Sequence, residues 1–257
     1  MATTDDNADQ LPTTTPPRLS VCMATYNGGQ FIASQLRSIL SQLSPEDEVV
    51  ISDDSSTDDT LAIIESFSDD RIRLFKNQTF CSPIYNFEHA LKQSRGDIIF
   101  LSDQDDEWVE GWVEAALATL RVVSLVVCEI SFIDAEGSPL MLPDATTYKG
   151  NRRSGVLHNL YRNDYMGCSC AFRRNVLEAA LPFPAKLPWH DWWIGLVADA
   201  FFKTRFIRSR FIRHRRHGGN ASATGGKSNS TSYDKILMRW RIATALAWRL
   251  ASKRRAE

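Results

Sequence analysis

The first hundred residues repeat one pattern: an apolar run of strand length, a polar loop, and then apolar residues at helical spacing. The apolar runs at 19–24, 48–52, 71–75 and 97–101 predict four strands, and between them apolar residues recur every three or four positions. Strands that alternate with helices pair in parallel, because each crossover returns the chain to the same edge of the sheet. The sequence therefore predicts an α/β fold with a mixed, mostly parallel sheet flanked by helices.

The rest of the chain is less regular. We expect a helix near 108–120, a strand at 125–130, a strand-like segment at 166–172, a buried helix at 189–202 and a strand at 206–214. We expect one catalytic domain over 18–221, preceded by a disordered tail (1–17) and followed by a flexible Gly- and Ser-rich loop (222–232) and a basic amphipathic helix (233–257).

Charge is distributed unevenly along a chain whose formal net charge is only -1. Residues 1–107 hold 19 acidic and 7 basic side chains, whereas residues 200–257 hold 2 acidic and 15 basic ones. Apolar runs fall far short of the roughly 20 residues that cross a bilayer, the N-terminus lacks a signal-peptide pattern, and the five cysteines form no C-x-x-C pair. These features favour a cytoplasmic protein with reduced thiols, whose C-terminal part attracts anionic partners.

Polar clusters follow three of the predicted strands, at 25–29, 53–56 and 103–106. Carboxylates gathered at one sheet edge repel one another unless a cation or hydrogen-bond donors compensate. Asp103 and Asp105 offer the hard oxygen ligands that Mg²⁺ or Mn²⁺ prefers, and such ions complete their shells with phosphates, so the cluster predicts a diphosphate ligand. An isolated D-x-D is about as often a solvated turn that caps the next helix.

Two further clusters carry ionisable groups. Asp191 lies between aromatic residues at a helix start, where partial desolvation raises proton affinity and suits a general base; a simple helix cap is the alternative that the local residues favour. The basic run 213–220 could neutralise a leaving diphosphate, or could equally be a solvated strand end or a nucleic-acid patch.

Taken in order, several segments resemble family-2 glycosyltransferases, and among them the bacterial subgroup rich in rhamnosyltransferases. The matching segments are VCMATYNGGQFIASQLRSIL, VVISDDSSTDDTL, NFEHALKQSRGDIIFLSDQDDEW, SFIDAEGSPL, MGCSCAFRRNVL, HDWWIGLVA and RRHGGNAS, which cover roughly residues 18–221. The resemblance implies the GT-A type of fold, a Rossmann-like sheet. It also implies an inverting, metal-dependent transfer of a sugar, with rhamnose favoured, from a nucleotide diphosphate donor to an acceptor hydroxyl in cell-surface polysaccharide synthesis.

The resemblance also implies roles for individual residues. Asp191 matches the catalytic base, Asp105 the metal-holding carboxylate, and His217 a metal or diphosphate contact. The positions that match nucleotide-sugar contacts are Thr25, Tyr26, Asn27, Asp54, Asn86 and Asp103. Two positions depart from the common pattern: Ala24, where proline or threonine is usual, and Glu107, where an apolar residue is usual.

The expected partners are a dTDP- or UDP-linked sugar and a glycan or lipid-linked glycan acceptor, and no nucleic acid. The C-terminal helix has two interpretations that we weigh equally: a packed helix with a solvated basic face, or a helix lying on the anionic inner face of the cell membrane. A sugar nucleotidyltransferase is a rival function, although the first strand lacks the glycine-rich, lysine-containing loop that this reaction favours. A non-catalytic protein that binds an anionic partner is a second rival, and it would leave the acidic clusters unexplained.

Overall fold

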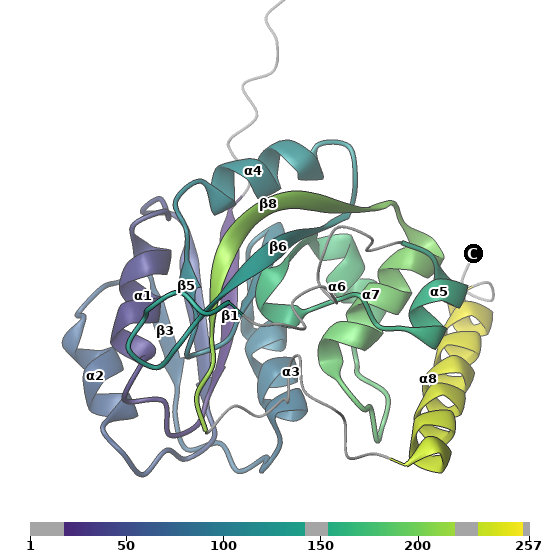
Figure 1. Cartoon of the computed structure of the whole chain (residues 1–257), viewed down its shortest axis with the longest axis horizontal. Helices are drawn as coiled ribbons and strands as arrows, with labels where there is room; N and C mark the ends of the chain where they lie inside the picture. Colours follow the sequence, from purple (N-terminus) through teal and green to yellow (C-terminus); the bar gives the residue numbers. More distant parts are fainter. Residues whose placement is uncertain (1–17, 142–153, 219–230, 254–257) are drawn as a thin grey trace, which may run out of the picture.

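The computed structural model describes residues 18–141, 154–218 and 231–253 (Figure 1). The expected tail (1–17) and most of the expected loop (222–232) lie outside the described residues. The first half has the predicted regular alternation: β1 (Leu19–Thr25), α1 (Ile32–Leu40), β2 (Glu48–Asp53), α2 (Thr60–Ser66), β3 (Ile72–Phe75), α3 (Pro83–Gln93) and β4 (Ile98–Ser102).

The second half mixes short and long elements. In chain order they are β5 (Glu107–Trp108), α4 (Trp112–Leu120), β6 (Leu125–Ile133), α5 (Val156–Tyr161), a single 3-10 turn η2 (Gly167–Ser169), β7 (Cys170–Arg173), α6 (Arg174–Ala180), α7 (His190–Phe201), β8 (Thr204–Arg215) and α8 (Ser232–Lys253). In Figure 1, α8 stands at the edge of the molecule, beside α5.

The eight strands of the described residues form one sheet in the order β3-β2-β1-β4-β7-β6-β8-β5. The strands β1 to β4 pair in parallel, β7 is antiparallel to both β4 and β6, and β6 is parallel to β8. Strands β6 and β8 therefore run in the same direction as β4. It follows that β1, β2, β4, β6 and β8 all end at one edge of the sheet, where loops from both halves of the chain meet.

The sheet is buried on both faces, because helices cover each of them. Successive side chains of a strand point to opposite sides and so enter different core clusters. Val21 and Met23 of β1 pack in one core cluster with α1, α2 and α4, whereas Cys22 between them packs in the other with α3, α6, α7 and α8. Near-continuous apolar runs are what strands covered by helices on both faces require. The predicted mixed, mostly parallel α/β architecture is thus confirmed.

Two predicted elements differ from the structure. The segment expected as a helix from 108 begins instead as the short strand β5, which pairs with β8 through Glu107 and Arg213, and the helix starts only at Trp112. Gly111 separates the two with φ of 87°, a left-handed conformation that glycine adopts at low cost. Within 166–172, the first part forms η2 rather than a strand.

Within the described ranges, no helix is both long enough and apolar enough to cross a membrane.

Candidate active site

The acidic loop that follows β4 lies at the edge of the sheet where most strands end. Asp106 is fully buried, while Asp103 and Asp105 are half-buried. Burial raises the pKa of Asp103 well above its usual range, and the negative charges of Asp106 and Asp105 raise it further. Burial also raises the pKa of Asp105, with a further contribution from Asp106. Without a cation, this loop therefore holds carboxyl groups that resist ionisation.

Asp106 has a cationic partner, His214, within the protein. Its Oδ1 lies 2.9 Å from Nδ1 of His214 and accepts a hydrogen bond of 3.0 Å from the backbone N–H of Arg215. Burial opposes both charges, but the ion pair prevails: the pKa of Asp106 is lowered and that of His214 is raised to about 9. Asp106, with Cys168 and His214 beside it, therefore serves to join the loop to the end of β8.

Asp105 is paired with the second imidazole of the same strand end. Nε2 of His217 lies 2.8 Å from Oδ2 of Asp105, and the His217 ring packs against Phe31 with centroids 4.6 Å apart. The carboxyl group of Asp105 and the imidazole of His217 are close enough to bind one ion together, and Asp103, whose burial disfavours its ionised form, lies beside them. Such oxygen and nitrogen donors suit Mg²⁺ or Mn²⁺. The residues therefore fit a divalent ion held by Asp105 and His217.

The loops after β1 and β2 are tied together by their own polar side chains. The Thr25 hydroxyl donates to Oδ2 of Asp53 (2.7 Å), and Oδ1 of Asn27 accepts the backbone N–H of Thr57 (2.8 Å). Oδ1 of Asp54 accepts the N–H of Phe80 (2.6 Å). These expected nucleotide contacts thus have structural partners of their own, which fix the loop shapes.

Two other expected nucleotide contacts differ in exposure. Nδ2 of Asn86, on the buried side of α3, donates to the Thr25 carbonyl (3.1 Å), while its Oδ1 is buried without a hydrogen-bond partner among the described residues. Tyr26, by contrast, is 58 % exposed. Its aromatic ring is therefore available to a planar ligand such as a nucleobase, whereas Asn86 lies beneath the loop.

Gln104 joins the loop after β1 to the acidic loop. Its Oε1 accepts the backbone N–H of Tyr26 (2.9 Å), and its Nε2 donates to the carbonyl of the same residue (3.1 Å). A Cβ at Gly28 would overlap the Gln104 amide, so only glycine allows this close approach. The sequence placed Gln104 in the oxygen-rich cluster 103–106 but did not reveal its contact with Tyr26.

Asp191 lies in the first turn of α7 and points toward the same edge. Its Oδ1 accepts the N–H of Trp192 (2.6 Å) and its Oδ2 accepts the N–H of Gly167 (3.0 Å). Burial nevertheless raises its pKa to about 6, and its charge contributes to the raised pKa of Asp103. A carboxylate held in one orientation, with a pKa near neutrality, has the properties of a general base.

Gly167 is a second residue that the sequence did not reveal. It belongs to η2, directly before β7, and a Cβ there would lie 3.2 Å from Nε2 of His190 and 3.5 Å from Cβ of Asp191. His190 is buried and stacks on Phe87 with ring centroids 4.2 Å apart. Gly167 therefore allows η2 to approach α7 closely enough to orient Asp191. The segment MGCSCAF contributed to the resemblance, but no local signal distinguished this glycine.

The structure thus brings all nine predicted site residues to one edge of the sheet. They come from the ends of β1, β2, β4 and β8 and from the starts of α3 and α7. Glu107, the departure from the common pattern, lies here too. Its Oε1 accepts hydrogen bonds from Arg215 (2.6 Å) and from the Ser34 hydroxyl (2.7 Å), so this chain offsets the extra charge locally.

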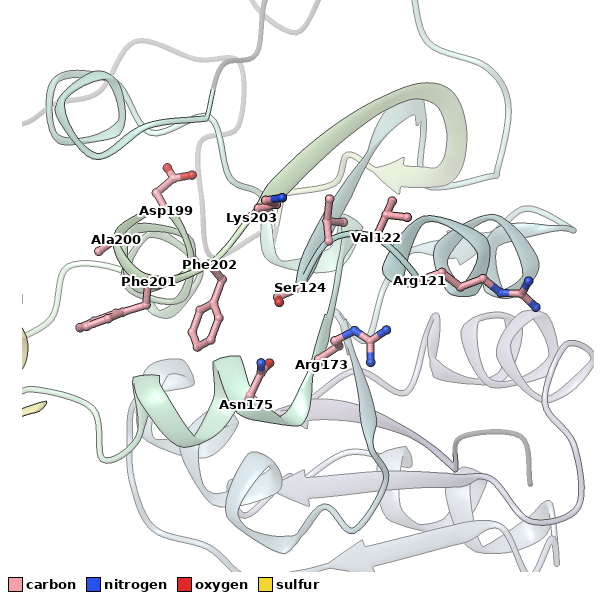
Figure 2. Close-up of a pocket in the computed structure, with 11 residues that line it drawn as sticks. Arg121, Val122, Ser124, Arg173, Asn175, Asp199, Ala200, Phe201, Phe202 and Lys203 are labelled. Carbon is pink, nitrogen blue, oxygen red and sulfur yellow. The ribbon is translucent and has the colours of Figure 1, made fainter. Parts of the chain in front are cut away.

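A cavity of about 550 Å³ lies elsewhere in the molecule (Figure 2). Ser124 and Lys203, just before β6 and β8, and Arg173, the last residue of β7, line it, so it lies at the opposite edge of the sheet. Two of its charged groups have internal partners: Arg173 donates to the Leu120 carbonyl, and Asp199 accepts from Tyr165 and Thr204. We therefore assign the chemistry to the carboxylate edge and not to this cavity.

Comparison with known proteins shows the family of this chain. The profile of glycosyl transferase family 2 matches residues 20–181. A UDP-Glc:alpha-D-GlcNAc-diphosphoundecaprenol beta-1,3-glucosyltransferase, WfgD of Escherichia coli, is 30% identical over 187 residues, which are 70% of this chain and 70% of that protein. A GalNAc(5)-diNAcBac-PP-undecaprenol beta-1,3-glucosyltransferase of Campylobacter jejuni is 36% identical over 107 residues, 40% of this chain and 33% of that one. The chain spans about a third of the length of the first curated relatives that it matches.

Solved structures share the fold. The Staphylococcus aureus TarS fragment 1-349 in complex with UDP-GlcNAc superposes with a TM-score of 0.68 at 20% identity, covering 88% of this chain and 66% of that one. The mannosyltransferase PcManGT of Pyrobaculum calidifontis, in complex with GDP-Man and Mn²⁺, gives a TM-score of 0.56 at 22% identity and covers 77% and 56%. The expected GT-A type of fold is thereby confirmed.

Proposed function

Because the chain belongs to glycosyl transferase family 2, we propose that it transfers a sugar from a nucleotide diphosphate donor to a hydroxyl of a glycan or lipid-linked glycan. One observation carries the proposal. Three carboxyl groups share one edge of the sheet: Asp103 and Asp105 of the loop after β4, and Asp191 at the start of α7. The negative charges of Asp105 and Asp191 contribute to the raised pKa of Asp103. Such a site suits a reaction in which a diphosphate is bound and a proton is removed from a hydroxyl.

We assign Asp191 the role of general base. Its carboxylate takes the proton of the acceptor hydroxyl while that oxygen forms a bond to the anomeric carbon and the bond from that carbon to the diphosphate breaks. The hydrogen bonds from Trp192 and Gly167 hold the carboxylate in place for this step. Attack opposite the leaving group inverts the anomeric configuration, which NMR of the product would test directly.

Asp105 and His217 would hold the divalent ion, Mg²⁺ or Mn²⁺, which supplies positive charge to the diphosphate when bound. Asp103 faces the same position and is assigned to the donor sugar or ribose. On the nucleotide side, Tyr26 offers its exposed ring, and Thr25, Asn27, Asp54 and Asn86 give the surrounding loops their shape.

The comparisons favour a different donor from the one that the motifs suggested. Both named relatives are glucosyltransferases, and the E. coli name specifies UDP-Glc. We therefore propose a UDP-linked hexose, with dTDP-rhamnose as the alternative that rests on motif resemblance alone. The same names place undecaprenol diphosphate on the acceptor, which supports a lipid-linked glycan and synthesis of a polysaccharide on the inner face of the membrane.

Calorimetric titration of the whole chain with UDP, dTDP and GDP, each with and without Mn²⁺, tests this proposal. We expect one nucleotide to bind in a metal-dependent way and Asp105→Ala to abolish that binding. Asp59→Ala, which removes an exposed carboxylate from the same edge, is the matched control and should bind normally. If no nucleotide binds under any condition, the proposed transfer is wrong and a non-catalytic role takes its place.

A further inference from the structure

The outer face of α8 exposes large apolar and aromatic side chains. Tyr233, Ile236, Trp240 and Trp248 of this helix are all exposed, Trp240 at 63 % and Trp248 at 68 %. The neighbouring helix α5 adds Leu157 and Tyr161, which are 85 % and 77 % exposed. We call these six residues the aromatic face. The helix packs against the domain, and large apolar side chains meet the solvent in addition to its exposed cations.

This face is held outward by the opposite side of α8. Ile242 and Leu246 are buried in the core cluster that contains α7, and Arg249 donates to the carbonyls of Ala179, Leu181 and Pro182. Arg239 donates to the carbonyl of Tyr161 and so joins α8 to α5. The helix cannot turn its tryptophans inward without breaking these contacts. The exposure of the aromatic face is thus a property of how the helix docks.

An apolar face of this extent requires a partner, because single-chain proteins rarely leave large aromatic side chains gathered in water. The charge of the helix indicates which kind. α8 carries Lys235, Arg239, Arg241, Arg249 and Lys253 against a single acidic residue, Asp234, and Lys235 and Arg241 are exposed. Aromatic side chains with exposed cations beside them suit the boundary between anionic headgroups and acyl chains.

We propose that the aromatic face lies on an anionic lipid bilayer and holds the protein at the membrane surface. The inference deepens the proposed function, because a lipid-linked acceptor is confined to that surface. The binding itself needs no donor or acceptor, so it is measured separately from sugar transfer. Figure 1 shows α8 at the right-hand edge of the molecule, with its first turn at the lower side of the view, the side toward which β8 also runs.

Vesicle flotation with the full chain tests the proposal, using phosphatidylcholine vesicles with and without phosphatidylglycerol and no nucleotide sugar. We expect binding only to the anionic vesicles, and a shift of tryptophan fluorescence to shorter wavelength on binding. Trp240→Ser with Trp248→Ser should weaken binding at least about ten-fold, since both side chains leave the interface. Lys235→Gln with Arg241→Gln should weaken it mainly at low salt.

Val122→Ser is the matched control, because Val122 is an exposed apolar side chain outside the aromatic face. It should bind as the unaltered chain does, and thermal unfolding checks that the tryptophan variant keeps its fold. Equal binding to neutral and anionic vesicles, or no loss in the tryptophan variant, would overturn the proposal. So would a dimer in light scattering that the tryptophan substitutions dissociate while vesicle binding is absent, since a second copy would then be the partner. Failure of nucleotide binding in calorimetry would leave this result unaffected.

Discussion

The two halves of the sheet build the same edge by different means. In the first half, the loops after β1 and β2 are fixed by hydrogen bonds between their own residues. The Thr25 hydroxyl donates to Asp53, and the Thr57 backbone N–H donates to Asn27. In the second half, imidazole side chains at the end of β8 contact carboxyl groups more than a hundred residues earlier: His214 contacts Asp106 and His217 contacts Asp105. Acidic side chains of the first half thus pair with side chains of the more basic second half, and the uneven charge along the chain contributes to joining the two halves.

This difference separates shape from reactivity. The hydrogen bonds of the first-half loops fix the shape of the edge. The junction with the second half gathers five groups with shifted pKa values: the pKa is raised for Asp103, Asp105, Asp191 and His214 and lowered for Asp106. Shifted pKa values gathered in one place are typical of functional sites. Substitutions at the junction should therefore affect reaction and stability more than substitutions in the first-half loops.

The largest effect is expected at the general base. Asp191→Asn keeps the volume but only one accepting oxygen, so it can keep one of the two hydrogen bonds from Trp192 and Gly167, and it cannot take the proton of the acceptor hydroxyl. We expect kcat to fall by roughly 10²- to 10⁴-fold, with the Kd of the donor unchanged, measured by initial rates and calorimetry. Wild-type turnover in this variant would show that another group acts as the base.

The ion pair between the halves should dominate stability. His214→Phe leaves Asp106 buried without its cation, and we expect a loss of about 3–5 kcal/mol in the free energy of unfolding by urea. Lys76→Ala, which breaks an exposed pair with Glu65 in the first half, is the comparison and should cost less than about 1 kcal/mol. The double variant Asp106→Asn with His214→Phe should recover part of the loss. Equal costs for the two single variants would contradict the distinction between the halves.

Sequence reasoning predicted the first half well for a physical reason. Parallel strands buried on both faces are nearly uniform apolar runs, and crossover helices show a clear period, so each cycle from β1 to β4 is legible locally. The edge at which polar loops meet follows from that topology alone. The second half could not be predicted equally well, since the pairing of Glu107 with Arg213 and the contact of Gly167 with Asp191 depend on tertiary approach and not on local pattern.

The site shows the same limit. That the carboxylates of the acidic loop belong together could be predicted from their place after a buried strand, but not that Asp106 would differ from its neighbours. Its distinct behaviour depends on His214, which lies more than a hundred positions away in the chain. Likewise, the role of Gln104 depends on the backbone of Tyr26 and on a glycine at position 28.

The pH dependence offers a smaller effect with a defined sign. The carboxyl of Asp191 has a pKa of about 6 and acts only when ionised, so kcat/KM should fall as the pH falls through 6, by about ten-fold for each unit below it. Activity should be independent of this group above pH 7. Donor affinity measured by calorimetry at each pH is the control, because Asp103 and Asp105 also take up protons. A profile that stays flat down to pH 5 would contradict the assignment of Asp191 as the base.

The smallest effect on donor affinity is expected at Gln104, where the acidic loop contacts the loop after β1. Gln104 belongs to the acidic loop but makes a first-half type of contact, a pair of neutral hydrogen bonds with the backbone of Tyr26. Gln104→Ala removes both bonds from a position that water reaches, so each contributes about 0.5–1.5 kcal/mol at most. We expect donor affinity to weaken several-fold in calorimetry while kcat changes little, because Asp105, His217 and Asp191 keep their own partners. Gln104→Glu is the sharper variant: it can still accept the Tyr26 N–H but adds a charge beside Asp103 and Asp105. If Gln104→Glu lowers the affinity for the donor more than Gln104→Ala does, the added charge determines how this loop affects donor binding. If Gln104→Glu instead restores the affinity, the hydrogen bond to Tyr26 determines it.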